Sequence, residues 1–463
     1  MKLLICFPLA LGLVVTACNK NKQASPQAEQ PTKTTIVAEG ISADAPDPCS
    51  LVLAPHLGDE KIDRDIVFYQ TKVSAEQNAF QSVENLGWLY VAKARESFDP
   101  GFYKLAEQCA LCLDSRQPHC AEALLLRGHV LQNLHKFKEA EPLARELVAK
   151  RGRSFDYGLL GDVVMEQGRL NEAAEAYQKM VDLKPDLEAY ARIAHYRWLK
   201  GDLTAAKEVM QMAVSAASPH APESAAWVNT RLAFLQFQVG DFAAANETCD
   251  TALGFQKNYA PALLLRGRLL LADGKTAEAV EALTSAEKLN PLPDYQWALA
   301  EALNEDGRPD EARAVEARLN QSGAGTDPRT YALYLATRSQ ATRTAVELAQ
   351  NELATRGDVF THDALAWALA ADGQHAQAYQ EMQLAVAEGT LDARLLFHAT
   401  VIASQAGHAE EAARWQDKTI GRLQQLLPSE QKQFQQTAIQ IGSAEKLETE
   451  TETKTADIST SGN

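Results

Sequence analysis

An alanine recurs along this chain at a nearly constant interval, and this period limits the folds open to it more than any other feature. Successive members of the series are 34, 33, 33, 39, 34, 33, 33, 33 and 34 residues apart. A period of roughly 20–50 residues is typical of arrays in which each unit buries its apolar face only against its neighbours. The series is Ala106, Ala140, Ala173, Ala206, Ala245, Ala279, Ala312, Ala345, Ala378 and Ala412.

Two further columns keep register with these alanines. Glycine stands five residues before the alanine in eight of the ten units, as at Gly168, which favours one helix ending in the left-handed region before the next begins. Gly or Ala stands twelve residues before the alanine in eight of ten units. Each unit is therefore predicted to be two antiparallel helices that approach closely through small residues. The predicted packing residues include Gly161, Ala173, Ala206, Ala245 and Ala279.

The unit from Ser154 to Leu187 resembles the tetratricopeptide repeat (TPR), a helix-turn-helix of about 34 residues. Gly161, Ala173, Tyr177 and Pro185 carry this resemblance, which extends over residues 87–425, although the family's Trp and Tyr of the first helix are mostly missing. The resemblance implies an all-α fold, an α-solenoid of about ten helix pairs. It also implies a concave surface, lined by the first helices, that binds segments of partner proteins.

Both ends of a solenoid need covers, because the stacking face is otherwise exposed. Residues 49–86 are predicted to form an N-terminal segment with a capping helix, and residues 426–442 a C-terminal capping helix. The one long interval, between Ala206 and Ala245, predicts an extended loop or a lengthened helix start near residues 215–222.

Residues 1–17 have the pattern of a secretory signal peptide, with Lys2 followed by an apolar run too short to span a bilayer. The run ends Val-Thr-Ala before Cys18, which resembles the bacterial lipobox. That resemblance implies cleavage before Cys18 and attachment of lipid to it, and Asn19 in place of Asp implies the outer membrane. The alternative is an ordinary signal peptide followed by a chance cysteine.

The segments that flank the repeats are polar. Residues 18–48 are predicted to be a flexible tether and residues 443–463 a disordered tail, because neither has enough apolar residues to bury. With the lipid anchor as the membrane contact, the chain is predicted to lie in the bacterial cell envelope, on the outer membrane and facing the periplasm.

Charge excludes one class of partner. The formal net charge is −16, with no Lys/Arg-rich run, whereas nucleic-acid binding needs clustered cations that displace counterions from phosphates. Nucleic acid is therefore not an expected partner, and other envelope proteins are.

Four cysteines are candidates for disulfides, because an exported chain meets an oxidising compartment. We expect two disulfides of unknown pairing among Cys49, Cys109, Cys112 and Cys120. A thioredoxin-like redox pair at Cys109 and Cys112 is the alternative, but such a pair requires a helix N-terminus after a strand. Cys249 is expected to be an inert buried thiol.

Motifs for chemistry are absent from the sequence. There is no phosphate-binding loop, nucleophile elbow or dinucleotide fingerprint, and the ten histidines lack metal-ligand spacing. The chain is therefore predicted to be no enzyme and to hold neither cofactor nor metal.

The predicted partner site is the exposed side of the first helices, which is rich in residue types found at binding hot spots. His195, Trp198, Arg268 and Trp297 are the central candidates, with Phe234 and Tyr334 beside them; packing between units is the alternative role. The full set is His129, Asp162, His195, Trp198, Trp227, Phe234, Arg268, Trp297, Glu301, Asn304, Tyr334 and Trp367.

The sequence thus predicts a lipid-anchored scaffold that binds proteins on its concave surface. A regulatory module that activates a cell-wall or envelope enzyme is the alternative function. A thiol redox protein that uses Cys109 and Cys112 is the more distant one.

Overall fold

The computed structural model describes residues 47–76 and 78–440. The chain divides into two units, residues 1–45 and 46–463, and the description concerns the second. The predicted signal peptide, the lipid site Cys18 and the tail lie outside the described residues, as does nearly all of the tether.

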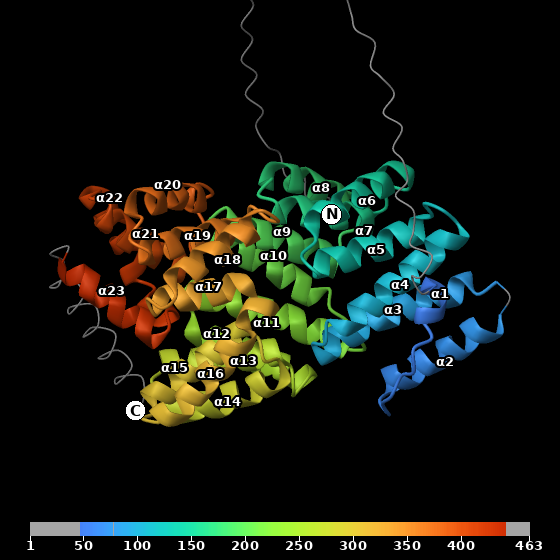
Figure 1. The fold of residues 1–463 in the computed structure, drawn as a ribbon, viewed down its shortest axis with the longest axis horizontal. Coiled ribbons are helices and arrows are strands. Elements are labelled where there is room, and N and C mark those ends of the chain that lie inside the picture. The colour runs from blue at the N-terminus through green and yellow to red at the C-terminus, as the bar shows by residue number, and fades with distance from the viewer. Residues whose placement is uncertain (1–46, 77, 441–463) are drawn as a thin grey trace, which may run out of the picture. The chain divides into compact units, whose positions relative to one another are not determined.

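The described residues form α-helices, one short 3-10 helix (η1) and no strand (Figure 1). The elements are α1 (Pro48–Leu51), α2 (Lys61–Ala75), α3 (Phe80–Ser97), α4 (Gly101–Arg116), α5 (Ala121–Asn133), α6 (Phe137–Lys150), α7 (Ser154–Glu166), α8 (Leu170–Leu183), α9 (Leu187–Leu199), α10 (Leu203–Ser215), α11 (Pro222–Gln238), α12 (Phe242–Phe255), α13 (Ala260–Ala272), α14 (Thr276–Leu289), α15 (Pro293–Glu305), α16 (Pro309–Thr326), α17 (Pro328–Thr337), α18 (Thr342–Leu353), α19 (Val359–Ala371), α20 (His375–Val386), α21 (Ala393–Gln405), α22 (Ala409–Ile420), η1 (Leu423–Gln425) and α23 (Pro428–Gln440).

Helices α3 to α22 pack as consecutive antiparallel pairs, so the predicted all-α solenoid is confirmed. The alanine series lies in the interiors of these pairs, and every member is between 0% and 1% exposed. The long interval between Ala206 and Ala245 is taken up by a short loop and by α11, which is lengthened to 17 residues. No helix in the described ranges combines the length and apolarity needed to cross a bilayer.

The small-residue column works as predicted, because side chains of the partner helix fill the space beside it. A Cβ added at Gly161 would lie 2.4 Å from Cε1 of Tyr177, and the Tyr177 side chain is itself buried between α7 and α8. The pair can close only because this position has no side chain.

Replacing Gly161 by Ala is therefore expected to lower the free energy of unfolding by about 1–3 kcal/mol, the usual range for overpacking. Gly254 is the matched control, since it also lies in a helix and a Cβ there would meet nothing within 4 Å. Gly254→Ala is expected to be neutral or to stabilise by up to about 1 kcal/mol. Urea unfolding followed by far-UV circular dichroism compares the two, and equal effects would contradict the packing role of Gly161.

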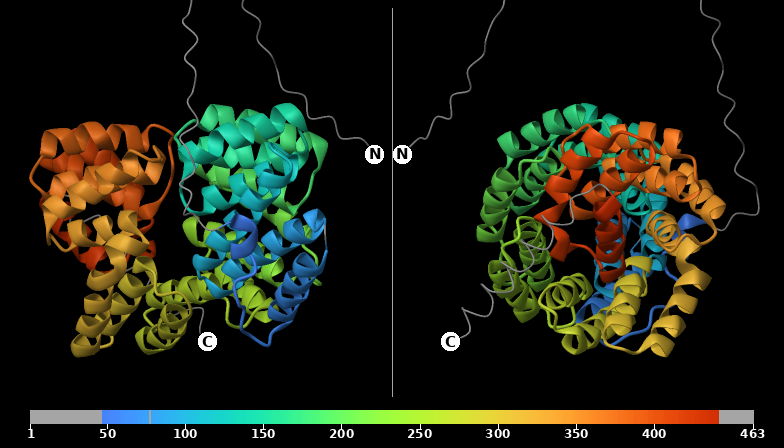
Figure 2. Two further views of the ribbon diagram at one scale, coloured as in Figure 1. Left: turned by 45° about the vertical axis from the view of Figure 1, so that its right-hand side comes forward. Right: turned by 90° about the vertical axis from the view of Figure 1, so that its left-hand side faces the viewer.

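The solenoid winds into a ring-like superhelix whose successive turns touch (Figure 2). The glycines at two repeat junctions make this approach possible: a Cβ at Gly168 would lie 2.3 Å from the carbonyl oxygen of Gly357, and one at Gly201 2.2 Å from that of Gly389. Lys200 also pairs with Glu388. We call this contact, between residues 166–201 of one turn and 354–392 of the next, the seam.

The N-terminal segment joins the first repeat through one disulfide. The capping helix predicted near residues 62–73 is α2, and α1 is held to α4 by the bond between Cys49 and Cys112. The expectation of a second disulfide is wrong, because Cys109 and Cys120 are free and buried. Cys109 faces α3, where a Cβ on Gly87 would approach its Cβ to 3.0 Å, so it lies inside the helix pair. Cys249 is buried, as predicted.

The C-terminal helix α23 lies on the inner face of the superhelix, a place that the sequence did not predict. It contacts α15 and α21, and the view along the ring places it inside (Figure 2). Ser429 donates its backbone N–H and its hydroxyl to Glu301, at 3.0 and 2.6 Å. Gln433 donates to the carbonyl oxygen of Thr337 at 2.6 Å. Part of the concave surface is therefore occupied by the chain itself.

Candidate interaction surface

Three of the predicted partner-site residues form one aromatic cluster on the inner side. The rings of His195 and Trp198 lie 5.4 Å apart, and those of Trp198 and Phe234 5.2 Å apart. Phe360 stacks on Trp198 from across the seam at 5.3 Å. Trp198 is therefore 5% exposed and serves mainly as packing between turns.

Trp297 and Tyr334 are not exposed, so that expectation is wrong for both. They are 0% and 1% exposed, with ring centroids 5.8 Å apart. The guanidinium of Arg394, from α21, covers the Trp297 ring at 4.5 Å. The later elements of the chain fold over this part of the surface, which the register of α15 alone does not reveal. Four more residues expected to be exposed are buried, namely Asp162, Trp198, Glu301 and Trp367.

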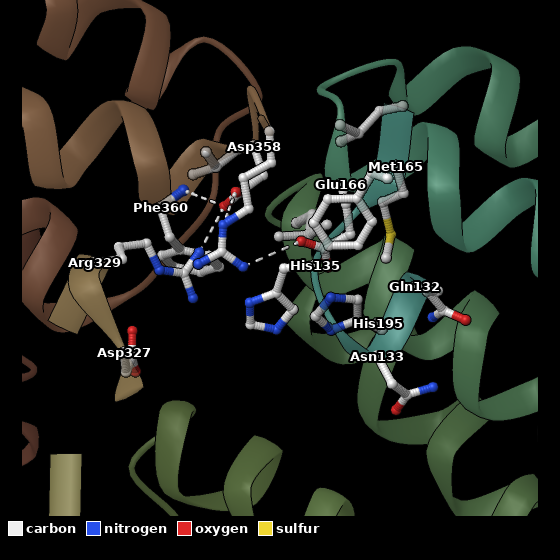
Figure 3. A pocket seen from close by; sticks show the side chains of 15 residues that line it. Gln132, Asn133, His135, Met165, Glu166, His195, Asp327, Arg329, Asp358 and Phe360 are labelled. Atoms are coloured by element: carbon white, nitrogen blue, oxygen red, sulfur yellow. Dashed lines mark hydrogen bonds and ion pairs between the residues drawn. The ribbon is translucent and has the colours of Figure 1, made fainter. Parts of the chain in front are cut away.

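A cavity of about 350 Å³ opens at the seam, and we call it the seam cavity (Figure 3). Its charged groups come from both turns: Arg329, Arg356, Asp327 and Asp358 from one, and Glu166 from the other. The remaining lining residues are Gln132, Asn133, His135, Phe137, Met165, Leu170, His195, Leu199, Val359 and Phe360.

The charges in the seam cavity largely compensate one another. Burial tends to raise the pKa of Asp358, but Arg329 and Arg356 outweigh it and hold the pKa below its usual range. Burial, aided by the charge of Asp358, raises the pKa of Glu166 to about 7. Burial and nearby arginines lower the pKa of His135 to about 4, so this imidazole is neutral at pH 7. The cavity therefore offers no excess charge to a ligand.

A second cavity, of about 290 Å³, lies between α11, α13 and the start of α15, and we call it the inner pocket. Three residues of the predicted set line it, namely Trp227, Phe234 and Arg268. Arg268 lies 5.6 Å from the ring centroid of Phe237 and donates to the carbonyl oxygen of Gln425 at 3.0 Å. The full lining is Trp227, Thr230, Arg231, Phe234, Tyr259, Pro261, Leu264, Leu265, Arg268 and Asp294.

Arg231 also lines the inner pocket and is not among the residues predicted from the sequence. Its Nη2 lies 3.0 Å from Nδ1 of His195, and its guanidinium carbon 5.3 Å from the Phe234 centroid. The sequence has no acidic residue three or four positions to either side of Arg231, so it predicts no ion pair along the helix for this arginine.

Comparison with known families agrees with the helix-pair architecture. A tetratricopeptide repeat model matches residues 125–188, 159–222 and 264–325, and a second tetratricopeptide repeat model matches residues 359–383. The chain is a tetratricopeptide repeat protein. Repeats of this family serve as protein-interaction scaffolds, so protein partners in general are supported. No curated protein sequence matches the chain.

Several solved structures are similar to this TPR protein. The APC/C hetero-tetramer Cut9-Hcn1 is 11% identical with a TM-score of 0.44, covering 78% of this chain; this chain spans 61% of that one. Yeast Tom70 is 13% identical with a TM-score of 0.34, over 83% of this chain and 92% of that one. A Parabacteroides merdae TPR protein is 16% identical with a TM-score of 0.37, over 49% and 86%.

Within the ranges 47–76 and 78–440, the TPR protein has no group of three His, Cys, Asp or Glu side chains placed to hold a metal ion. The two candidate redox cysteines, Cys109 and Cys112, do not form a disulfide with each other. Cys112 is bonded to Cys49, and burial raises the pKa of Cys109, which is 0% exposed. A buried thiol of this kind yields little of the thiolate that redox exchange requires.

The raised pKa of Glu166 predicts a pH dependence of the seam. A carboxyl group whose folded pKa of about 7 exceeds its ordinary 4.5 binds more protons folded than unfolded, so stability falls as pH rises between these values. We expect a loss of about 1–2 kcal/mol, moderated by solvent, because the side chain is 28% exposed. Urea unfolding at both pH values tests this, and Glu166→Gln should remove that part of the dependence. An unchanged dependence in the variant would contradict the assignment.

Proposed function

We propose that this TPR protein is a non-enzymatic scaffold that holds partner proteins of the bacterial envelope on the inner surface of its solenoid. The observation that carries the proposal is the inner pocket. There, aromatic, leucine and arginine side chains stay partly exposed, whereas α23 packs on α15 and α21 elsewhere on the inner surface. Trp, Tyr and Arg are the residue types enriched at binding hot spots.

Two features support the envelope as its location. The sequence before Cys18 has the pattern of a lipoprotein signal, and a lipid on that cysteine would anchor the scaffold in the outer membrane. The bond between Cys49 and Cys112 fits an oxidising compartment, since disulfides persist there and are rare in the cytosol. A regulatory module that activates an envelope enzyme would use the same surface and would differ only in the identity of its partner.

Site-specific photocrosslinking in intact cells tests the proposal. A p-benzoylphenylalanine at Leu264, in the inner pocket, is expected to give defined protein adducts. The same group at Lys179, an exposed residue of α8, is the matched control and should give none. Equal adducts at both positions, or none at Leu264, would count against the inner surface as the binding site.

Removal of the lipid site tests the anchor separately. Cys18→Ala should shift the protein from the membrane to the soluble fraction and abolish labelling by radioactive palmitate. Membrane association that survives this substitution would refute the lipid anchor but would leave the scaffold role standing.

A further inference from the structure

Arg231 carries a positive charge inside the protein without a negative charge to balance it. Its guanidinium contacts the imidazole of His195 and the face of Phe234, and it pairs with no carboxylate in the described part of the chain. Burial lowers the pKa of Arg231, and the group that opposes this effect is the phenol of Tyr259 rather than a carboxylate. His195 does not compensate, because burial and Arg231 lower its pKa to about 3 and leave it neutral.

Several other enclosed arginines in the described part of the chain have carboxylate partners. Arg192 binds Asp162 with Nη2 and Oδ2 2.7 Å apart, and Arg151 binds Asp156 with Nη2 and Oδ1 2.6 Å apart. A charge withdrawn from water is costly unless it is paired. Arg231 has no such partner in the described part of the chain, a feature that it shares with Arg268 of the same pocket and with Arg422.

Arg394, on the same inner surface, has both an aromatic and a carboxylate partner. Its guanidinium lies 4.5 Å from the Trp297 centroid, and it binds the carboxylate of Glu430. That carboxylate comes from α23, an element that packs onto the inner surface from elsewhere in the sequence. Arg231 has the aromatic half of this arrangement, with Phe234, and lacks the carboxylate.

The lining of the inner pocket indicates what would complete it. The lining contains two guanidinium groups, of Arg231 and Arg268, and one carboxylate, that of Asp294, so it carries one more positive charge than negative. Apolar groups of Trp227, Leu264 and other residues form the rest of the wall. Charge and apolarity together favour an acidic side chain that is next to a large apolar one.

We propose that the inner pocket binds an Asp or Glu side chain of a partner protein, with an adjacent bulky apolar side chain on the aromatic wall. This inference rests on the proposed scaffold function and specifies the partner's chemistry. A charge-assisted hydrogen bond to Arg231 should then account for much of the selectivity.

Peptide binding to the purified full chain tests the inference. The probes are fluorescent octapeptides, acetylated and amidated, with a central Leu-Phe-Glu-Leu or Leu-Phe-Gln-Leu. Fluorescence anisotropy should show the Glu peptide binding at least about tenfold more tightly, as expected for a hydrogen bond to a charged group. Equal affinities, or no binding of the Glu peptide up to about 1 mM, would overturn the proposal.

Variants separate the charge of Arg231 from its contribution to folding. Arg231→Gln should reduce the affinity for the Glu peptide to that for the Gln peptide, and Arg231→Lys should restore part of it. The matched control, Arg116→Gln, alters an exposed residue at the end of α4 and should change neither affinity. Retained selectivity in Arg231→Gln would refute the role of Arg231, and an unchanged affinity for the Gln peptide shows that this variant is folded.

The chain's own terminal residues are a competing source of carboxylates. Residues 441–463 contain Glu445, Glu448, Glu450, Glu452 and Asp457. If deleting them raised the affinity for the Glu peptide about tenfold or more, the tail would be the occupant and the partner proposal would fail. An unchanged affinity supports an external partner.

The two proposals fail in different ways. If Leu264 gave crosslinks but the chain showed no preference for the Glu peptide, the scaffold function would stand and the binding of an acidic side chain would be refuted. A preference for the Glu peptide without crosslinks in cells would retain the chemistry of the pocket and refute the scaffold.

Discussion

Trp297→Ala is expected to lower the free energy of unfolding by about 3–5 kcal/mol, the range for removal of a large buried aromatic. The indole is 0% exposed, lies beneath Arg394 and against Tyr334, and donates from Nε1 to Oε1 of Glu301 at 3.1 Å. The effect is measured locally, as lost amide hydrogen-exchange protection in α15 and α17.

Trp227→Ala is the matched control, since this tryptophan lines the inner pocket and is partly exposed. We expect it to cost less than about 1.5 kcal/mol of stability and to weaken binding of the Glu peptide. A Trp297 variant that kept its hydrogen-exchange protection and lost only peptide binding would show that Trp297 contacts the partner and does not stabilise the fold.

The helix-pair architecture could be predicted because its determinants are local. Gly161 and Ala173 lie within one repeat, and the contact they permit forms between two helices joined by a short turn. Repetition makes the pattern recognisable. One small residue predicts little, whereas small residues at the same position of ten units define the register of the repeats. The left-handed turns between the two helices of a repeat also depend on local sequence. Gly101 is the exception among the glycines of this column, because it begins α4 and Phe98 adopts the positive φ of 56° instead.

The seam could not be predicted, because it joins residues far apart in sequence. Lys200 and Glu388 are separated by 188 residues, and their meeting depends on the small rotation from each repeat to the next, summed over a whole turn. No pattern within one repeat encodes that sum. Gly357 and Gly389 lie outside the repeat columns. Only the fold shows that they contact Gly168 and Gly201 of the neighbouring turn.

The candidate site was half predictable for a related reason. The register indicates which side of a first helix points inward, and Phe234 and Arg268, which it selects, line the inner pocket. It does not indicate what later covers that side, as happens to Trp297. Neither Arg231 nor Arg394 has an acidic residue three or four positions away, yet only Arg394 receives a carboxylate, from Glu430. Local sequence cannot distinguish the two arginines.

Glu430→Ala is expected to release α23 from the inner surface at a cost of about 3–5 kcal/mol, the penalty for leaving a buried partner uncompensated. Glu430 is 0% exposed, binds Arg394, and accepts a hydrogen bond from the Leu427 N–H at 2.8 Å. Hydrogen exchange and limited proteolysis of α23 measure the release. Glu410→Ala, at an exposed glutamate in the first turn of α22, is the control and should leave α23 protected.

Replacing both partners distinguishes a stabilising ion pair from a merely compensated one. Arg394→Leu combined with Glu430→Leu removes both charges, and such replacements are often neutral. Protection of α23 should therefore return in the double variant. If the double variant lost as much protection as Glu430→Ala, the shape of these side chains, rather than their charge, would hold α23 in place.

The same pair predicts how α23 responds to acid. Burial tends to raise the pKa of Glu430, but Arg394 and the Leu427 N–H outweigh it and hold the pKa below its ordinary value. The folded state therefore binds this proton less readily than the unfolded chain. The stability from the pair is fully present above the unfolded pKa of about 4.5 and is lost as pH falls through the lower, folded pKa. Limited proteolysis with an acid-active protease should then cut α23 more rapidly below about pH 4. Glu430→Gln, which cannot ionise, should show the same cleavage on both sides of that pH. If the two proteins responded alike, the acid sensitivity of α23 would come from carboxylates other than Glu430.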